Sequence, residues 1–117
     1  MITVLQNGTL LRAPNGAILD AHSSITLIRS TGKNVIVDSG FPGDEVNIIK
    51  GLEATGLTPL DIHIVINTHG HMDHTAGNKL FTNARFLLHP LEGGRNVGPP
   101  GCEVEEVRVL DLDARKR

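Results

Sequence analysis

Short apolar runs separated by turn residues dominate the N-terminal third of the chain. The dipeptides Asn7-Gly8 and Asn15-Gly16 lie between such runs, and Asn-Gly is a strong signal for a two-residue hairpin turn. The β-rich runs 24–29 and 34–37 are separated by a short segment that contains Gly32. We therefore expect this part of the chain to form strands joined by tight turns.

A helical hydrophobic period replaces the strand-like pattern in the middle of the chain. Val46, Ile49 and Leu52 recur three residues apart, which predicts a helix over residues 43–55 with these side chains on one face. Gly56 follows directly, as expected for a residue that ends a helix.

The remaining hydrophobic pattern predicts four more elements. They are a strand over 62–66, a short helix over 73–81, a strand over 85–88 and a last strand over 103–110. The chain therefore contains two consecutive βαβ units.

Strands joined by a crossover helix run parallel, so their carboxyl ends meet at one edge of the sheet. Ligand sites in α/β sheets lie beyond these ends. Asp38, the loop 69–74 and His89 each follow one of the predicted parallel strands. We expect them to share one edge.

At that edge, one run of six residues contains three imidazoles and a carboxylate. They are His69, His71, Asp73 and His74. Neutral imidazole and carboxylate are ligand types that suit zinc, iron and manganese. The alternative is a polar helix start in which Asp73 caps the helix and the histidines are solvated. Capping explains one of the four residues, so the pattern favours a metal site.

Composition restricts the other possible functions. The chain has 117 residues and a net charge of −2, which fits one domain over residues 1–117 and no broad attraction to nucleic acid. The single cysteine, Cys102, excludes an internal disulfide and a cysteine-based zinc site. No apolar run is long enough to span a membrane and no leader is recognised, so we expect a cytoplasmic protein. We also expect residues 111–117 to form a flexible tail.

The motif resembles the metallo-β-lactamase superfamily. Residues 68–78 read Thr-His-Gly-His-Met-Asp-His-Thr-Ala-Gly-Asn after an apolar strand, and residues 35–40 read Val-Ile-Val-Asp-Ser-Gly. The resemblance covers about residues 18–90. It implies an α/β fold that is half of an αββα sandwich, with a mixed sheet and two βαβ units.

The resemblance also implies roles. His69 and His71 would bind a first metal ion, and Asp73 and His74 a second. Asp73 would also orient or deprotonate the attacking water, and Asp38 would hold a ligand in place by accepting its hydrogen bond. The site would hold one or two zinc ions, with iron or manganese as alternatives. The reaction would be hydrolysis of a phosphodiester or of a small-molecule ester, thioester or amide.

The chain resembles only the first half of this family, whose second half supplies further ligands. No histidine follows His89. A half-sandwich would leave an apolar sheet face uncovered, so we expect a homodimer in which a second copy replaces the missing half. The alternatives are a non-catalytic metal-binding or dimerising half-domain, and a fragment of a longer hydrolase.

The other candidate residues have weaker patterns around them. His89 is either a polar strand terminus or a pocket residue. We expect His63 to be structural, His22 to be solvated, and Cys102 to be a small thiol without a nucleophilic role.

Overall fold

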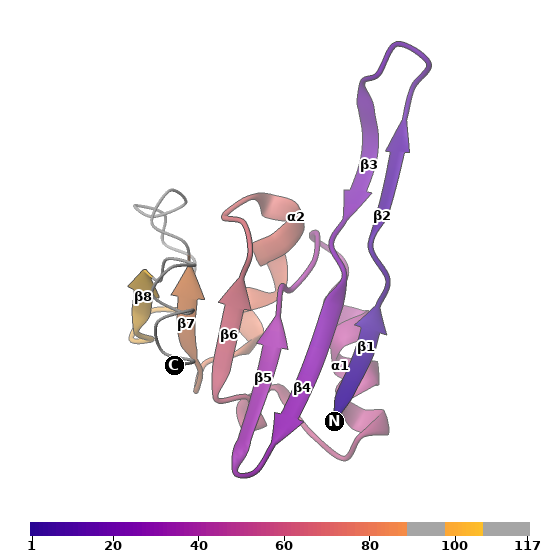
Figure 1. Cartoon of the computed structure of the whole chain (residues 1–117). Helices are drawn as coiled ribbons and strands as arrows, with labels where there is room; N and C mark the ends of the chain where they lie inside the picture. Colours follow the sequence, from indigo (N-terminus) through magenta and orange to yellow (C-terminus); the bar gives the residue numbers. More distant parts are fainter. Residues whose placement is uncertain (89–97, 107–117) are drawn as a thin grey trace, which may run out of the picture.

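The computed structural model describes residues 1–88 and 98–106, which form a six-stranded sheet, a two-stranded ribbon and short helices (Figure 1). The strands are β1 (Ile2–Gln6), β2 (Thr9–Arg12), β3 (Ile18–His22), β4 (Ile25–Ser30), β5 (Lys33–Val37), β6 (Ile64–Asn67), β7 (Arg85–Leu88) and β8 (Val104–Glu106). The helices are α1 (Glu45–Ala54) and α2 (Met72–Thr75), with 3-10 turns η1 (Pro59–Asp61) and η2 (Ala76–Leu80).

The main sheet is mixed and has the order β1-β4-β5-β6-β7-β8. β1, β4 and β5 pair antiparallel, whereas β5, β6, β7 and β8 pair parallel. α1 connects β5 to β6, and α2 with η2 connects β6 to β7. The predicted α/β class, mixed sheet and two βαβ units are confirmed.

One face of this sheet carries the hydrophobic core. Ile36, Val65 and Phe86 are neighbours across β5, β6 and β7, and all three are fully buried. Ile48 and Leu52 of α1 belong to the same buried cluster. Figure 1 shows the helices gathered behind the sheet, so this face is covered by them.

The middle of the opposite face of the sheet is also apolar, and no helix of the described residues covers it (Figure 1). Two rows of side chains cross it, and all of their members are partly exposed. The first row is Ile28, Val35 and Ile64, and the second is Val37, Ile66 and Leu87. They are flanked in the same rows by Thr26, Arg85 and Glu105. An aliphatic surface of this kind is typical of an interface.

The N-terminal hairpin prediction is half wrong. Asn15-Gly16 does form the turn between β2 and β3, where Gly16 adopts a φ of 87°. Asn7-Gly8 does not form a hairpin, because β1 pairs with β4 and β2 pairs with β3. The Gln6 side chain fixes the end of β1 beside β4 rather than β2. Its Nε2 donates to Ser23 O at 3.0 Å and to Asp44 Oδ2 at 2.8 Å.

The predicted helix over 43–55 is present as α1, but its buried face differs. Ile48 and Leu52 are buried, whereas Val46 and Ile49 are 55% and 37% exposed. The apolar face therefore follows a spacing of four residues. Its end is as predicted: Gly56 has a φ of 80°, and the Leu57 N–H donates to Leu52 O at 2.9 Å.

The predicted helix over 73–81 is broken into α2 and η2. The Ala76 N–H donates to Gly40 O instead of to a carbonyl of its own helix, so the α-helical bonding stops there. The predicted last strand over 103–110 is present as β8 up to Glu106, and its residues 107–110 lie outside the described part of the chain. His89 and the tail 111–117 lie outside the described residues.

In the part of the chain that the structure describes, no helix is long and apolar enough to cross a membrane.

Candidate metal centre

The loop 69–74 lies where β6 ends, next to the residues that follow β5. In Figure 1 it runs from the arrowhead of β6 into α2, at the carboxyl edge of the parallel strands. The structure therefore brings Asp38 and the histidine loop to one rim, as the connectivity predicts.

Asp38 is the buried acceptor of this rim. Its Oδ1 accepts the Thr68 N–H at 2.8 Å, and its Oδ2 accepts the Thr68 hydroxyl at 2.6 Å. His74 Nδ1 lies 3.0 Å from the same Oδ2. The residue has a φ of 59°, a left-handed conformation that aspartate tolerates better than most residues. The backbone at Asp38 therefore turns its carboxylate toward the histidine loop.

The Asp38 carboxylate sets the direction of the neighbouring hydrogen bonds. It can only accept, so His74 Nδ1 carries a proton, and the Thr68 hydroxyl uses its one proton on Asp38. The Thr68 oxygen, 3.0 Å from His69 Nδ1, must then accept from that ring as well. The Nε2 atoms of neutral His69 and His74 rings consequently keep their lone pairs for another partner.

The three imidazole rings lie close together. The ring centroids of His69 and His74 are 4.5 Å apart, and those of His69 and His71 are 5.9 Å apart. His74 Nε2 lies 3.4 Å from Asp73 Oδ2. His69 and His71 are exposed at the rim.

These donors fit a divalent cation by chemical type but do not form a complete set. Among residues 1–88 and 98–106, no three His, Cys, Asp or Glu side chains are arranged so that together they could hold a metal ion. The assignment of His69, His71, Asp73 and His74 as ligands therefore stays a prediction.

Three buried polar residues behind the loop were missed by the sequence analysis. Ser39, Asn67 and Asn78 are almost fully buried and hydrogen-bonded to one another. An asparagine at the end of an apolar strand and another directly after Gly77 were the available signals. Two buried amides near a motif of this kind indicate a hydrogen-bond network.

His22, which we expected to be solvated, is partly buried and lies between two carboxylates. Its Nδ1 lies 2.8 Å from Asp44 Oδ2 and its Nε2 lies 3.0 Å from Asp20 Oδ1. The hydrogen bond to Asp44 raises the pKa of His22 above 6.5, against a smaller opposing effect of burial. Burial acts to raise the pKa of Asp44, but the hydrogen bonds from Gln6, His22 and the Phe41 N–H outweigh it and lower that pKa below 3.8.

The His22–Asp44 pair predicts a pH-dependent free energy of unfolding. The raised pKa of His22 stabilises the fold below pH 6.5, and this contribution is lost as pH rises through the folded pKa. The lowered pKa of Asp44 stabilises the fold above pH 3.8, and its contribution is lost as pH falls through the folded pKa. Urea unfolding midpoints measured from pH 6.5 upward should therefore decline in the wild type more than in His22→Gln. Parallel profiles for the two proteins would contradict this.

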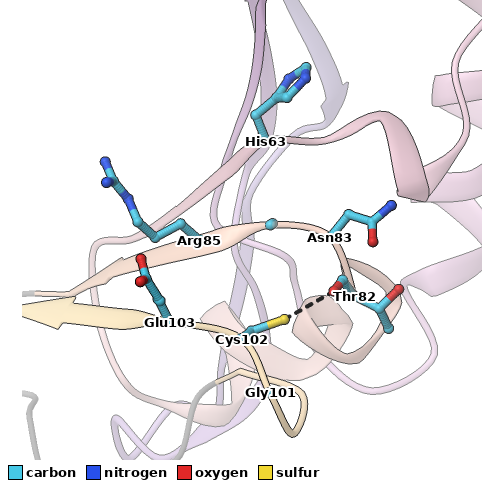
Figure 2. A pocket seen from close by; sticks show the side chains of 8 residues that line it. His63, Thr82, Asn83, Arg85, Gly101, Cys102 and Glu103 are labelled. Atoms are coloured by element: carbon cyan, nitrogen blue, oxygen red, sulfur yellow. Dashed lines mark hydrogen bonds between the residues drawn. The ribbon is translucent and has the colours of Figure 1, made fainter.

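A separate hollow of about 270 Å³ lies at the opposite edge of the sheet, near the starts of β7 and β8 (Figure 2). Figure 2 shows Cys102 pointing toward Thr82, whose carbonyl oxygen is 3.2 Å from the thiol sulfur. His63 Nδ1 accepts the Asn34 N–H at 2.9 Å, which ties the start of β6 to β5. The His63 contact joins two strands, and the Cys102 thiol contacts the main-chain oxygens of Phe81 and Thr82.

Comparison with known proteins decides the family. The sequence model described as the Metallo-beta-lactamase superfamily matches residues 19–111. The chain belongs to this superfamily. The resemblance seen in the motif is thereby confirmed.

The superfamily relatives are longer than this chain. A probable metallo-hydrolase of Methanocaldococcus jannaschii is 48% identical over 82% of this chain, which covers 47% of that protein. Metallo-beta-lactamase domain-containing protein 1 of Xenopus laevis is 36% identical over 62% of this chain and 31% of its own length. The chain thus spans about half or less of these relatives and matches a family of hydrolases.

Solved structures of the superfamily share the fold. A Thermotoga maritima protein assigned as a metallo-beta-lactamase is 25% identical with a TM-score of 0.68, covering 81% of this chain and 45% of that one. The dizinc quorum-quenching lactonase AidC is 25% identical with a TM-score of 0.53, covering 62% of this chain and 28% of its own. The described fold therefore corresponds to one part of a larger architecture.

Proposed function

We propose that the chain is a metal-dependent hydrolase that corresponds to the amino-terminal half of the family fold. Its loop would bind one or two divalent cations, zinc first and iron or manganese as alternatives, through His69, His71, Asp73 and His74. The observation that carries the proposal is the rim itself, where Asp38 fixes Nδ1 of His74 and leaves Nε2 beside Asp73.

The chemistry proposed is attack of water on an ester, thioester, amide or phosphodiester. A bound divalent cation would supply an acidified water and polarise the bond to be cleaved. Asp73 would orient that water or take its proton. Asp38 keeps the proton of His74 on Nδ1, which makes Nε2 the available donor atom.

The second half of the site would come from a partner half-domain, and we propose a second copy of this chain. The partly exposed aliphatic rows of β4 to β7, which no helix of the described residues covers, are the surface on which it would pack. The chain would then act as a homodimer, whereas a fragment of a longer hydrolase would use its own missing half.

Removing one imidazole from the loop should lower metal content sharply. His71→Ala is expected to lose at least half of the zinc measured per chain by mass spectrometry, because a catalytic ion held by few protein ligands cannot spare one. His63→Ala is the matched control, since it removes an exposed imidazole from the opposite edge of the sheet. Unchanged zinc in His71→Ala would remove this residue from the site.

The same sample tests the partner and the reaction. Light scattering at micromolar protein should give twice the chain mass, and activity on generic thioester and phosphodiester substrates should disappear with chelator and return with zinc. A monomer that binds no metal would refute the homodimer and leave the fragment reading. A dimer that binds zinc without turnover would refute the hydrolase and favour the non-catalytic half-domain.

A further inference from the structure

The main-chain carbonyl of His74 is bonded from outside its own helix. α2 has four residues, so the carbonyls at its end have no partner within the helix. The Ser39 N–H donates to His74 O at 2.9 Å, and Asn67 Nδ2 donates to it at 3.0 Å. These donors follow β5 and end β6, so two neighbouring parallel strands hold one carbonyl.

This carbonyl fixes the direction of a longer chain of hydrogen bonds. His74 O can only accept, so Asn67 must turn its amino group to it and its Oδ1 away. Asn78 Nδ2 donates to that Oδ1 at 2.8 Å, and Asn78 Oδ1 accepts the Ser39 hydroxyl at 2.7 Å. One acceptor thereby orients two side-chain amides and a hydroxyl.

The network is closed to water. Ser39 has no exposed surface, and Asn67 and Asn78 are each 2% exposed. Every buried side-chain nitrogen and oxygen of the described residues has a hydrogen-bond partner. A buried polar network that is fully satisfied is rigid, because breaking any member leaves an unpaired group in a low dielectric.

We infer that Ser39, Asn67 and Asn78 are positioning residues that clamp the main chain of His74 between the ends of β5 and β6. Asp38 holds the ring of the same residue through Nδ1. The main-chain clamp and the ring contact together keep His74 Nε2 beside the Asp73 carboxylate. Only the metal-binding consequence of this inference rests on the proposed function.

The ring of His74 in metal-free protein reports the clamp directly. Two-bond ¹⁵N–¹H correlation spectra distinguish the Nδ1–H and Nε2–H tautomers of a neutral imidazole. We expect the Nδ1–H form in the wild type and a mixture of forms in Asn78→Leu and Ser39→Ala. Asn83→Ala is the control, because it removes an exposed amide bonded to the Leu60 carbonyl on the far side.

Zinc affinity gives the second measurement. The Zn²⁺ dissociation constant should rise about tenfold or more in Asn78→Leu and less in Ser39→Ala, as for other groups that orient a ligand. If Asn78→Leu does not unfold cooperatively, Ser39→Ala decides, since it removes only a hydroxyl. Folded variants with a pure Nδ1–H tautomer and unchanged zinc affinity overturn the inference. A tautomer change in protein whose wild type binds no zinc supports the clamp and refutes the proposed metal site.

Discussion

Gly77→Ala is expected to lower the free energy of unfolding by about 3 kcal/mol, because the added methyl has no room. A Cβ at this position would lie 2.6 Å from Ile48 Cδ1 and 2.6 Å from the Ser39 carbonyl oxygen. The Ile48 side chain can shift, but the Ser39 carbonyl belongs to backbone that is fixed by β5 and by the Gly77 N–H. The substitution should therefore separate α1, η2 and the loop after β5, and urea unfolding measures the loss.

Gly56→Ala is the matched control for this experiment. Gly56 has nothing within 4 Å of its added Cβ, but its φ of 80° strains any residue with a side chain. Gly56→Ala should lower the free energy of unfolding by about 1 kcal/mol, which is the cost of placing a residue with a side chain in the left-handed conformation. Equal losses in the two variants would show that the close packing of Gly77 carries no energetic weight.

Asp38→Ala should cost about 3 kcal/mol, because it leaves a part-buried main-chain N–H and an imidazole N–H without their acceptor. The carboxylate takes hydrogen bonds from Thr68 and His74, and the residue is 6% exposed. Alanine at a φ of 59° adds backbone strain that aspartate bears more easily. Thermal and urea unfolding should both report the loss.

Asp61→Ala provides the comparison for Asp38→Ala. The Asp61 carboxylate also accepts a main-chain N–H and a threonine hydroxyl, both from Thr58, but it is exposed. Its loss should cost about 1 kcal/mol, as for a helix cap in contact with water. A cost for Asp38→Ala no greater than this would mean that water replaces the lost acceptor.

The parallel part of the fold was predictable because its signals are local and agree with one another. The apolar strand before His69 and the helical period ending at Gly56 each fix an element, and the handedness rule then sets the order. In the antiparallel N-terminal part the turns near Gly32 and at Asn15-Gly16 were also predictable. The pairing of β1 with β4 was not, because Asn7-Gly8 is a good turn sequence that tertiary contacts override. The Gln6 bonds to Ser23 and Asp44 join residues far apart in sequence, which no local pattern contains.

The candidate site divides in the same way. Asp38 and the loop 69–74 could be placed together from strand order alone. The clamp on His74 could not be predicted in this way. Asn78 lies on a 3-10 turn within the segment that the sequence pattern predicts to be one helix, and its partners Ser39 and Asn67 come from two other segments. His22 was missed for the same reason, since its partner Asp44 is remote in sequence.

The groups described above as holding His74 all lie between Asp38 and Asn78 in the sequence. These residues leave the ribosome before β7 and the residues that follow β7. The order of synthesis therefore allows this histidine to be locked in place while the rest of the polypeptide is still being made, because N-terminal units fold first as the chain emerges.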